Sequence, residues 1–214
     1  KMRVKRLHRM DLVFEPFLLS LIAGLATGIG GIIVVLVRRV SDRVVGFAMG
    51  LASGVMLLVS FNNLFLEAAG LLTHFELIVM FSFGALTMMA LDLVIPHIEL
   101  TTKKEGNKNR KMFRSGVLIA IGITLHNLPE GLVVTAGYAF MPRLGLIIAV
   151  AIMLHNIPEG VATAIPLTIA GTKPLKIAII TLLSGLAEPV AALVGAVAFS
   201  LVGTKSIMGF SLAF

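Results

Sequence analysis

The sequence contains no cysteine and few charged residues. Of its 214 residues none is cysteine, and only 14% are Asp, Glu, Lys or Arg. Without cysteine the chain can form neither a disulfide framework nor a thiolate metal site. A soluble domain usually has about 25% charged residues, whereas 57% of this chain is hydrophobic and its mean hydropathy is +1.01. These values indicate a chain embedded in lipid rather than a water-soluble domain.

The basic residues lie mainly in short connectors between apolar segments. The formal net charge is +7 at pH 7, a value that could suggest binding to nucleic acid. Basic residues in connectors are instead typical of membrane topology signals. The sequence therefore argues against a nucleic-acid partner and indicates the lipid bilayer as the surroundings of the chain.

Six apolar segments are long enough to cross about 30 Å of hydrocarbon as helices, which takes about 20 residues each. No small-residue cleavage site ends the first segment, so no signal peptide is predicted. The sequence predicts an all-α integral membrane protein, a polytopic helical bundle that forms a single transmembrane domain over residues 1–214. The six predicted helices cover residues 16–37, 44–66, 77–95, 115–140, 144–167 and 176–202.

The two ends of the chain are unusual for such a bundle. The apolar run at residues 207–214 is too short to cross a bilayer. We expect it to be the start of a seventh helix and the chain to be truncated there. The chain begins with Lys1, and Met10 is an alternative start that would make residues 1–9 an extension.

The basic residues also predict the orientation of the chain. Most of them lie in the connectors after the first, third and fifth segments, including a polar loop at 99–114, whereas the other connectors contain only Arg143 and Lys205. The positive-inside rule then places the loop in the cytoplasm and the amino terminus outside, in a multi-pass protein of the cell (inner) membrane. The basic residues within 1–9 favour the opposite orientation unless translation starts at Met10.

Glycines at four-residue spacing predict close helix packing. Gly24 and Gly28 form one such pair in the first segment, and Gly46, Gly50 and Gly54 form a longer stripe in the second. Stripes of small residues let helix backbones approach one another in lipid. A glycine face that lines a pore is the alternative interpretation.

Two segments in the middle of apolar helices are nearly identical. Residues 125–131 have the sequence LHNLPEG and residues 154–160 have LHNIPEG. Each contains a glutamate, and a third, Glu188, lies within the sixth segment. One charge at the centre of a bilayer costs about 2.5–3.5 kcal/mol on insertion scales, so three such charges need a compensating interaction. A divalent cation shared by the carboxylates would provide it.

The spacing within each copy fits a metal site. His126 and Glu130 are four residues apart and share a helix face, as do His155 and Glu159. Imidazole nitrogen and carboxylate oxygen bind zinc at about 2.0–2.2 Å. The amide that follows each histidine could offer oxygen to a second, harder metal position. Two facing copies would therefore form one metal site, or two sites that share carboxylates.

A proline stands beside each ligand cluster. Pro129 and Pro158 cannot donate to the carbonyl four residues earlier, so we expect both helices to kink there and to line a wet cavity. Glu188 is followed by Pro189 and repeats the pattern, which makes it the third contributor. Polar residues that only join helices would account for a single His or Asn, but the doubled motif favours a metal. Met56 is interpreted as a packing residue, with a soft gate as the alternative.

The doubled motif resembles signatures of the ZIP (Zrt- and Irt-like protein) family of divalent metal transporters, prokaryotic type. The residues HNLPEG at 126–131, HNIPEG at 155–160 and SGLAEP at 184–189 match its motifs for helices four, five and six. The resemblance covers the chain from about Met10 and implies an eight-helix fold, with helices four and five inside two inverted three-helix repeats. It implies a binuclear metal centre formed by His126, Asn127, Glu130, His155, Asn156, Glu159 and Glu188.

The resemblance also implies a function. It predicts transport of zinc toward the cytoplasm, with Fe²⁺, Mn²⁺, Co²⁺ and Cd²⁺ as other substrates, and no enzymatic activity or cofactor beyond the transported ion. The absence of cysteine favours zinc-like ions over Cu(I). Two features depart from the family pattern: helices seven and eight are missing, and the loop at 99–114 is rich in lysine rather than histidine. The sequence leaves open whether the protein forms a homodimer.

Two other functions fit parts of the pattern. An intramembrane zinc metalloenzyme typically has His-Glu-x-x-His on one helix, whereas each helix here has one histidine. A proton-coupled carrier of an organic substrate would use the glutamates as proton relays, but it has little use for paired histidines.

Overall fold

The structure is a computed structural model that describes residues 9–37, 40–100 and 107–202. Its elements are all helices, and no strand occurs in these ranges. In chain order they are α1 (Arg9–Val37), α2 (Asp42–Val59), the π-helix η1 (Ser60–Leu64), α3 (Phe65–Leu71), α4 (His74–Leu100), α5 (Lys108–Phe140), α6 (Pro142–Ile169), α7 (Pro174–Gly185) and α8 (Ala187–Val202).

Most of these helices are long and apolar enough to span a membrane. Five spans meet this condition within the described residues: Leu12–Val37, Asp42–Leu71, Lys108–Phe140, Pro142–Ile169 and Pro174–Phe199. In α4 a shorter apolar stretch covers His74–Ala90. The predicted all-α polytopic membrane bundle is thus confirmed. The predicted start of a seventh helix, 207–214, lies outside the described residues.

Several predicted boundaries differ from the structure, and α1 begins at Arg9 rather than at residue 16. The loop predicted at 99–114 is shorter, because α4 continues to Leu100 and α5 begins at Lys108. Lys and Arg are good helix formers, so the basic residues there extend α5. The second predicted helix consists of α2, η1 and α3 in succession. The sixth is divided into α7 and α8 at Leu186, where Pro189 removes the hydrogen bond to the carbonyl of Gly185.

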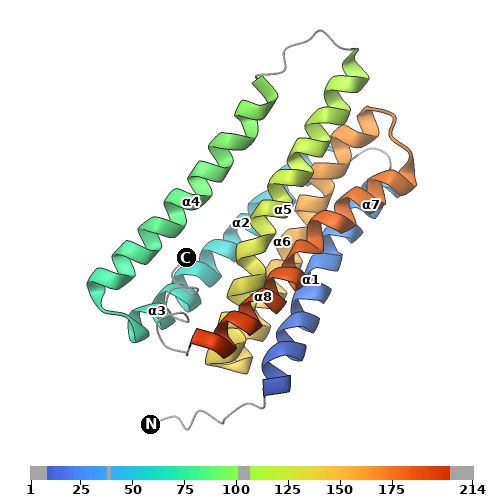
Figure 1. The fold of residues 1–214 in the computed structure, drawn as a ribbon. Helices are drawn as coiled ribbons and strands as arrows, with labels where there is room; N and C mark the ends of the chain where they lie inside the picture. The colour runs from blue at the N-terminus through green and yellow to red at the C-terminus, as the bar shows by residue number, and fades with distance from the viewer. Residues whose placement is uncertain (1–8, 38–39, 101–106, 203–214) are drawn as a thin grey trace.

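Helices α1, α5, α6, α7 and α8 pack together, and α4 lies to one side of them (Figure 1). Helix α1 contacts α5, α6, α7 and α8, while α2 packs against α6, and α4 contacts α5 and α3. The elements that carry the predicted ligands, α5, α6 and α8, are therefore in the interior of one packed group. Their neighbours α1 and α7 complete it.

Glycines bring α1 against α6 and α7. A Cβ added at Gly24 would collide with the carbonyl oxygen of Gly185, and one added at Gly28 would lie 3.2 Å from a side-chain carbon of Leu182. The close packing predicted for this pair is confirmed. The stripe predicted on α2 is not: a Cβ on Gly46, Gly50 or Gly54 would meet no atom within 4 Å among the residues that the structure covers. Spacing alone does not tell which helix face has a neighbour.

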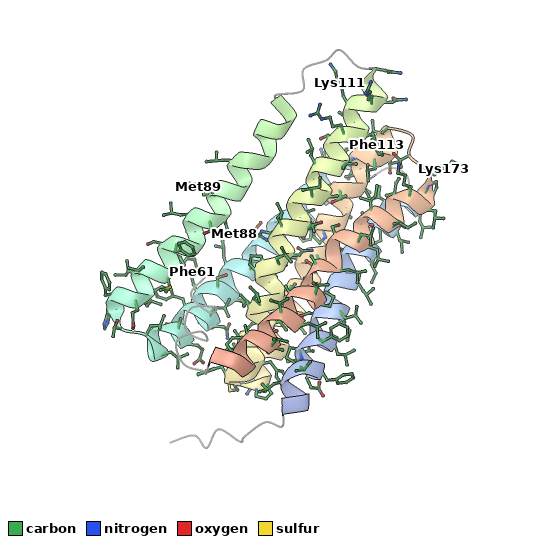
Figure 2. All side chains as sticks on the ribbon, in the orientation of Figure 1. Phe61, Met88, Met89, Lys111, Phe113 and Lys173 are labelled. Carbon is green, nitrogen blue, oxygen red and sulfur yellow. The ribbon has the colours of Figure 1, made fainter. Side chains whose placement is uncertain are left out.

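Many large apolar side chains point outward, and the interior combines apolar side chains with small and polar ones. Phe47, Phe75 and Leu175 are more than two-thirds exposed, and Figure 2 shows such side chains along the outer faces of the bundle. Among the fully buried side chains are polar ones from α1, α5, α6 and α8. This arrangement is expected for a bundle that faces lipid outside and surrounds a polar centre.

Candidate metal centre

The seven predicted ligands come from three helices that meet inside the bundle. Helix α5 contributes three of them, α6 contributes three, and the first turn of α8 contributes Glu188. Asn127, Asn156 and Glu188 are fully buried. The side chain of His155 is 6% exposed and that of His126 is 42% exposed. The cluster is therefore enclosed on the side of α8 and accessible at His126. We call these seven residues the ligand cluster.

Glu130 lies between the two histidines. Its Oε1 is 3.0 Å from Nε2 of His155 and 3.4 Å from Nε2 of His126. Nε2 of His155 is also 3.7 Å from Oε1 of Glu159. His126, His155 and Glu159 each have one potential ligand atom, and these three atoms lie within 4.8 Å of one another. Nitrogen and oxygen atoms at such separations can converge on one ion with small side-chain movements.

The two asparagines are held by backbone carbonyls of neighbouring helices. Nδ2 of Asn127 donates to the carbonyl oxygen of Ser184 at 3.1 Å, and Nδ2 of Asn156 donates to that of Ala23 at 2.9 Å. Because a carbonyl can only accept, these bonds fix which end of each amide is nitrogen. The amide oxygens of Asn127 and Asn156 are buried and have no hydrogen-bond partner among the described residues. They are free to coordinate a cation.

Each copy of the motif also brings a glycine against the helix that holds its asparagine. A Cβ on Gly131 would collide with the carbonyl oxygen of Glu188, and one on Gly160 with that of Thr27. Glu188 lies four residues after Ser184, whose carbonyl accepts from Asn127, and Thr27 lies four residues after Ala23, whose carbonyl accepts from Asn156. The motif thus fastens α5 to α7–α8 and α6 to α1 by the same two contacts. We call these the clamp contacts.

Several donor and acceptor atoms of the ligand cluster are buried without a hydrogen bond to any part of the chain that the structure describes. Both carboxylate oxygens of Glu130 and both ring nitrogens of His155 are in this state, as are Oε2 of Glu159 and Oε2 of Glu188. The short distance between His155 and Glu130 is close enough for charge attraction but does not have the geometry of a hydrogen bond. Buried polar atoms normally have a partner, and each one left without costs about 1–3 kcal/mol.

Among the residues that the structure describes, no Lys or Arg forms an ion pair with the carboxylates of the cluster. The sequence has no Lys or Arg within 115–142, 144–172 or 177–202, the stretches that surround the ligand cluster. Glu188 accepts a hydrogen bond from Asn156, an uncharged partner. Three glutamates, two histidines and two amide oxygens form a donor set suited to divalent metal ions such as zinc. A bound dication would supply both the missing charge and the missing partners.

A cavity of about 140 Å³ adjoins the accessible side of the cluster. His126, Pro129 and Glu130 form its wall on α5, and Met56 and Ser60 line it from α2 and η1. Met88, marked on α4 in Figure 2, also lines it. Met56 is thus at a cavity wall rather than only in packing contacts. No sequence pattern marks Ser60 or Met88 as residues that line this cavity, because the π-helix at Ser60 and the placement of α4 depend on tertiary contacts.

Comparison with known proteins gives a consistent result. A family model described as ZIP Zinc transporter matches residues 96–212, more than half of the chain. A zinc transporter ZupT of Escherichia fergusonii is 37% identical over 123 residues, which are 55% of this chain and 48% of that protein. The ZupT zinc transporter of Akkermansia muciniphila is 36% identical over 145 residues, or 59% and 54% of the two chains. The chain spans about half the length of these curated relatives. It belongs to the ZIP zinc transporter family.

Proposed function

We propose that this chain provides the metal-binding core of a transporter that moves zinc across the membrane toward the cytoplasm. The observation that carries the proposal is the ligand cluster, in which buried carboxylate, imidazole and amide atoms lack partners and no basic side chain is near in the sequence. A dication would satisfy these atoms, and the same groups can exchange it because His126 remains accessible. Zinc is then the transported substrate.

The relatives support zinc over other divalent ions. The ZupT proteins of similar sequence are zinc transporters by name, which disfavours the alternatives of a metalloenzyme or an organic-substrate carrier. The donor set also suits Fe²⁺, Mn²⁺, Co²⁺ and Cd²⁺, and we propose these as secondary substrates. Seven ligands are enough for a binuclear centre with Glu130 between the two ions. All seven come from one chain, so the proposal applies to a monomer and to a homodimer alike.

The charge distribution supports an orientation with the α4–α5 and α6–α7 connectors in the cytoplasm. Most of the basic residues that the structure describes lie in or next to the connectors α1–α2, α4–α5 and α6–α7. Figure 2 places Lys111 and Lys173 at the same end of the bundle. There Lys176 lies 4.6 Å from the ring centre of Phe113 and links α7 to α5. By the positive-inside rule this end faces the cytoplasm of the cell (inner) membrane, and the amino terminus lies outside.

Substitution of Glu130 tests the proposal. Because Oε1 of Glu130 lies within 3.4 Å of both histidines, the Glu130→Gln variant is expected to bind zinc at least about tenfold more weakly than the unmodified protein. Binding is measured by calorimetry on purified protein, and zinc uptake is measured separately in proteoliposomes. Binding and uptake are measured separately because the chain spans about half the length of its relatives, and zinc binding does not by itself demonstrate transport.

Glu15→Gln is the matched control. Glu15 is an exposed glutamate on α1, so its replacement removes the same charge without touching the ligand cluster. We expect this variant to bind zinc as the unmodified protein does. An unmodified protein that binds no zinc, or equal binding by the Glu130 and Glu15 variants, would reject the proposed function.

A further inference from the structure

Helix α1 contains a second copy of the sequence found at the break between α7 and α8. Residues 20–28 have the sequence SLIAGLATG and residues 181–189 have TLLSGLAEP. Both begin with a hydroxyl residue followed by leucine, and both contain the run Gly-Leu-Ala at the fifth to seventh positions. In this alignment Thr27 occupies the position of Glu188.

The two copies have equivalent positions in the structure. A Cβ on Gly24 would collide with the carbonyl of Gly185, and a Cβ on Gly185 would collide with the carbonyl of Gly24. The clamp contacts are equivalent as well, since α5 fastens to Ser184 and Glu188 and α6 fastens to the corresponding residues of α1. Exchanging α5 with α6 and α1 with α7–α8 therefore reproduces the clamp contacts.

The hydroxyl of Thr27 is buried without a partner. Threonines in helices usually donate to a carbonyl of the preceding turn, as Thr124, Thr135, Thr168 and Thr181 do here. Thr27 is fully buried, yet its Oγ1 has no hydrogen-bond partner among the described residues. This oxygen would lie 3.0 Å from a Cβ on Gly185, the residue after the one whose carbonyl holds Asn127.

We infer that α1 is a fourth helix of the metal centre and that Thr27 is its contribution, the uncharged counterpart of Glu188. Glu188 serves the half of the centre that contains Asn156, to which its carboxylate is hydrogen-bonded. Thr27 belongs to the half of the metal centre that contains Asn127, and it contributes a neutral oxygen to that half. The two halves therefore differ by one negative charge, and Thr27 sets this difference. The inference rests on the proposed function, because it concerns the same bound ion.

Removal of the hydroxyl tests the role of Thr27. Thr27→Val keeps the shape of the side chain, and zinc affinity measured by calorimetry is expected to fall about tenfold, as for groups that support metal ligands. The thermal midpoint of the metal-free protein should stay the same or rise, because a buried unpaired hydroxyl destabilises the fold. A residue with only a structural role would lose stability instead.

Ser20→Ala is the matched control for this measurement. Ser20 lies on the same helix, two turns before Thr27, and its hydroxyl is also fully buried and unpaired in the described part of the chain. Its variant is expected to bind zinc with unchanged affinity. Equal affinities of the Thr27→Val and Ser20→Ala variants would overturn the inference, as would a lower thermal midpoint for Thr27→Val.

Exchange of the two side chains provides a second, independent test. Glu188→Thr alone should weaken zinc binding, and the double variant T27E/E188T should recover most of the lost affinity, because the carboxylate returns to an equivalent position. A folded double variant that binds no better than Glu188→Thr would reject the equivalence. If the double variant does not fold, the comparison of zinc affinity between Thr27→Val and Ser20→Ala tests the inference. Zinc binding by the unmodified protein separates these outcomes from a failure of the proposed function.

Discussion

At the scale of single residues, the two histidines of the ligand cluster are in different surroundings. The side chain of His126 is 42% exposed and lines the cavity, whereas that of His155 is 6% exposed and lies between two glutamates. The sequence gives the two residues identical neighbours, so their difference arises from the helices packed around them. Helix α2 and Met88 of α4 leave space next to His126, and this could not be predicted from the motif.

Acid is expected to weaken zinc binding. Each ligand must lose its proton before it coordinates a metal, and histidine exchanges protons near neutral pH. The zinc affinity should therefore fall as the pH is lowered from neutral to about 5. Calorimetry in buffers of different ionisation enthalpy gives the number of protons released per zinc, which should be smaller in His126→Gln. An affinity that does not change over this pH range would contradict the prediction.

The positions of the predicted ligands followed from the sequence to a large extent. Four-residue spacing correctly put His126 and Glu130 on one helix face, and the structure places His155 between Glu130 and Glu159 and hydrogen-bonds Asn156 to Glu188. The hydrogen bonds of Asn127 and Asn156 could not be predicted, because they join residues 57 and 133 positions apart. Thr27 could not be identified from the sequence for a related reason: its unpaired hydroxyl and its place opposite Gly185 both depend on the packing of α1 against α7.

At the scale of helices, hydropathy predicted the order of the apolar helices and five of the six spans, but not their irregularities. The π-helix Ser60–Leu64 interrupts the second apolar segment, and its polar residues Asn62 and Asn63 do not by themselves mark a change of helix geometry. The break at Leu186 is different, because Pro189 identifies the carbonyl that loses its hydrogen bond. A proline within a helix is visible in sequence, whereas a π-helix is set by tertiary packing.

Glycines on α1 and on α2 are expected to respond differently to substitution. Gly24→Ala would place a methyl group against the backbone of Gly185 and force α1 away from α7, so the protein should lose thermal stability and zinc binding. Gly50→Ala meets no neighbour within 4 Å among the described residues. It should leave stability unchanged or raise it by up to about 1 kcal/mol, because alanine favours a helix over glycine. Thermal unfolding in detergent compares them, and equal loss in both variants would contradict the prediction.

At the scale of the whole molecule, the basic residues that the structure describes are more numerous at one end of the bundle than at the other. The basic end contains the α4–α5 and α6–α7 connectors, and Arg143 lies at the opposite end, between α5 and α6. The sequence alone predicted this asymmetry, since it depends only on the order of apolar and basic segments. The packing of α4 beside the other helices required the structure (Figure 1).

The proposed orientation predicts which side of the membrane each end faces. The chain has no cysteine, so a single introduced cysteine is the only reactive thiol. Arg143→Cys should react with a membrane-impermeant maleimide in intact cells, and Lys111→Cys should react only after permeabilisation. Both positions are exposed, so burial does not explain a difference between them. The reverse labelling pattern would place the amino terminus in the cytoplasm.

Within one ligand cluster, His126 is accessible and Glu188 is fully enclosed. An ion that arrives through the adjoining cavity would exchange its hydration waters for protein atoms in sequence, first imidazole, then the shared carboxylate, and last the innermost glutamate. Dehydration divided into such steps has several small barriers in place of one large barrier. The exposure gradient across the cluster would in this way govern how fast the metal is captured and released.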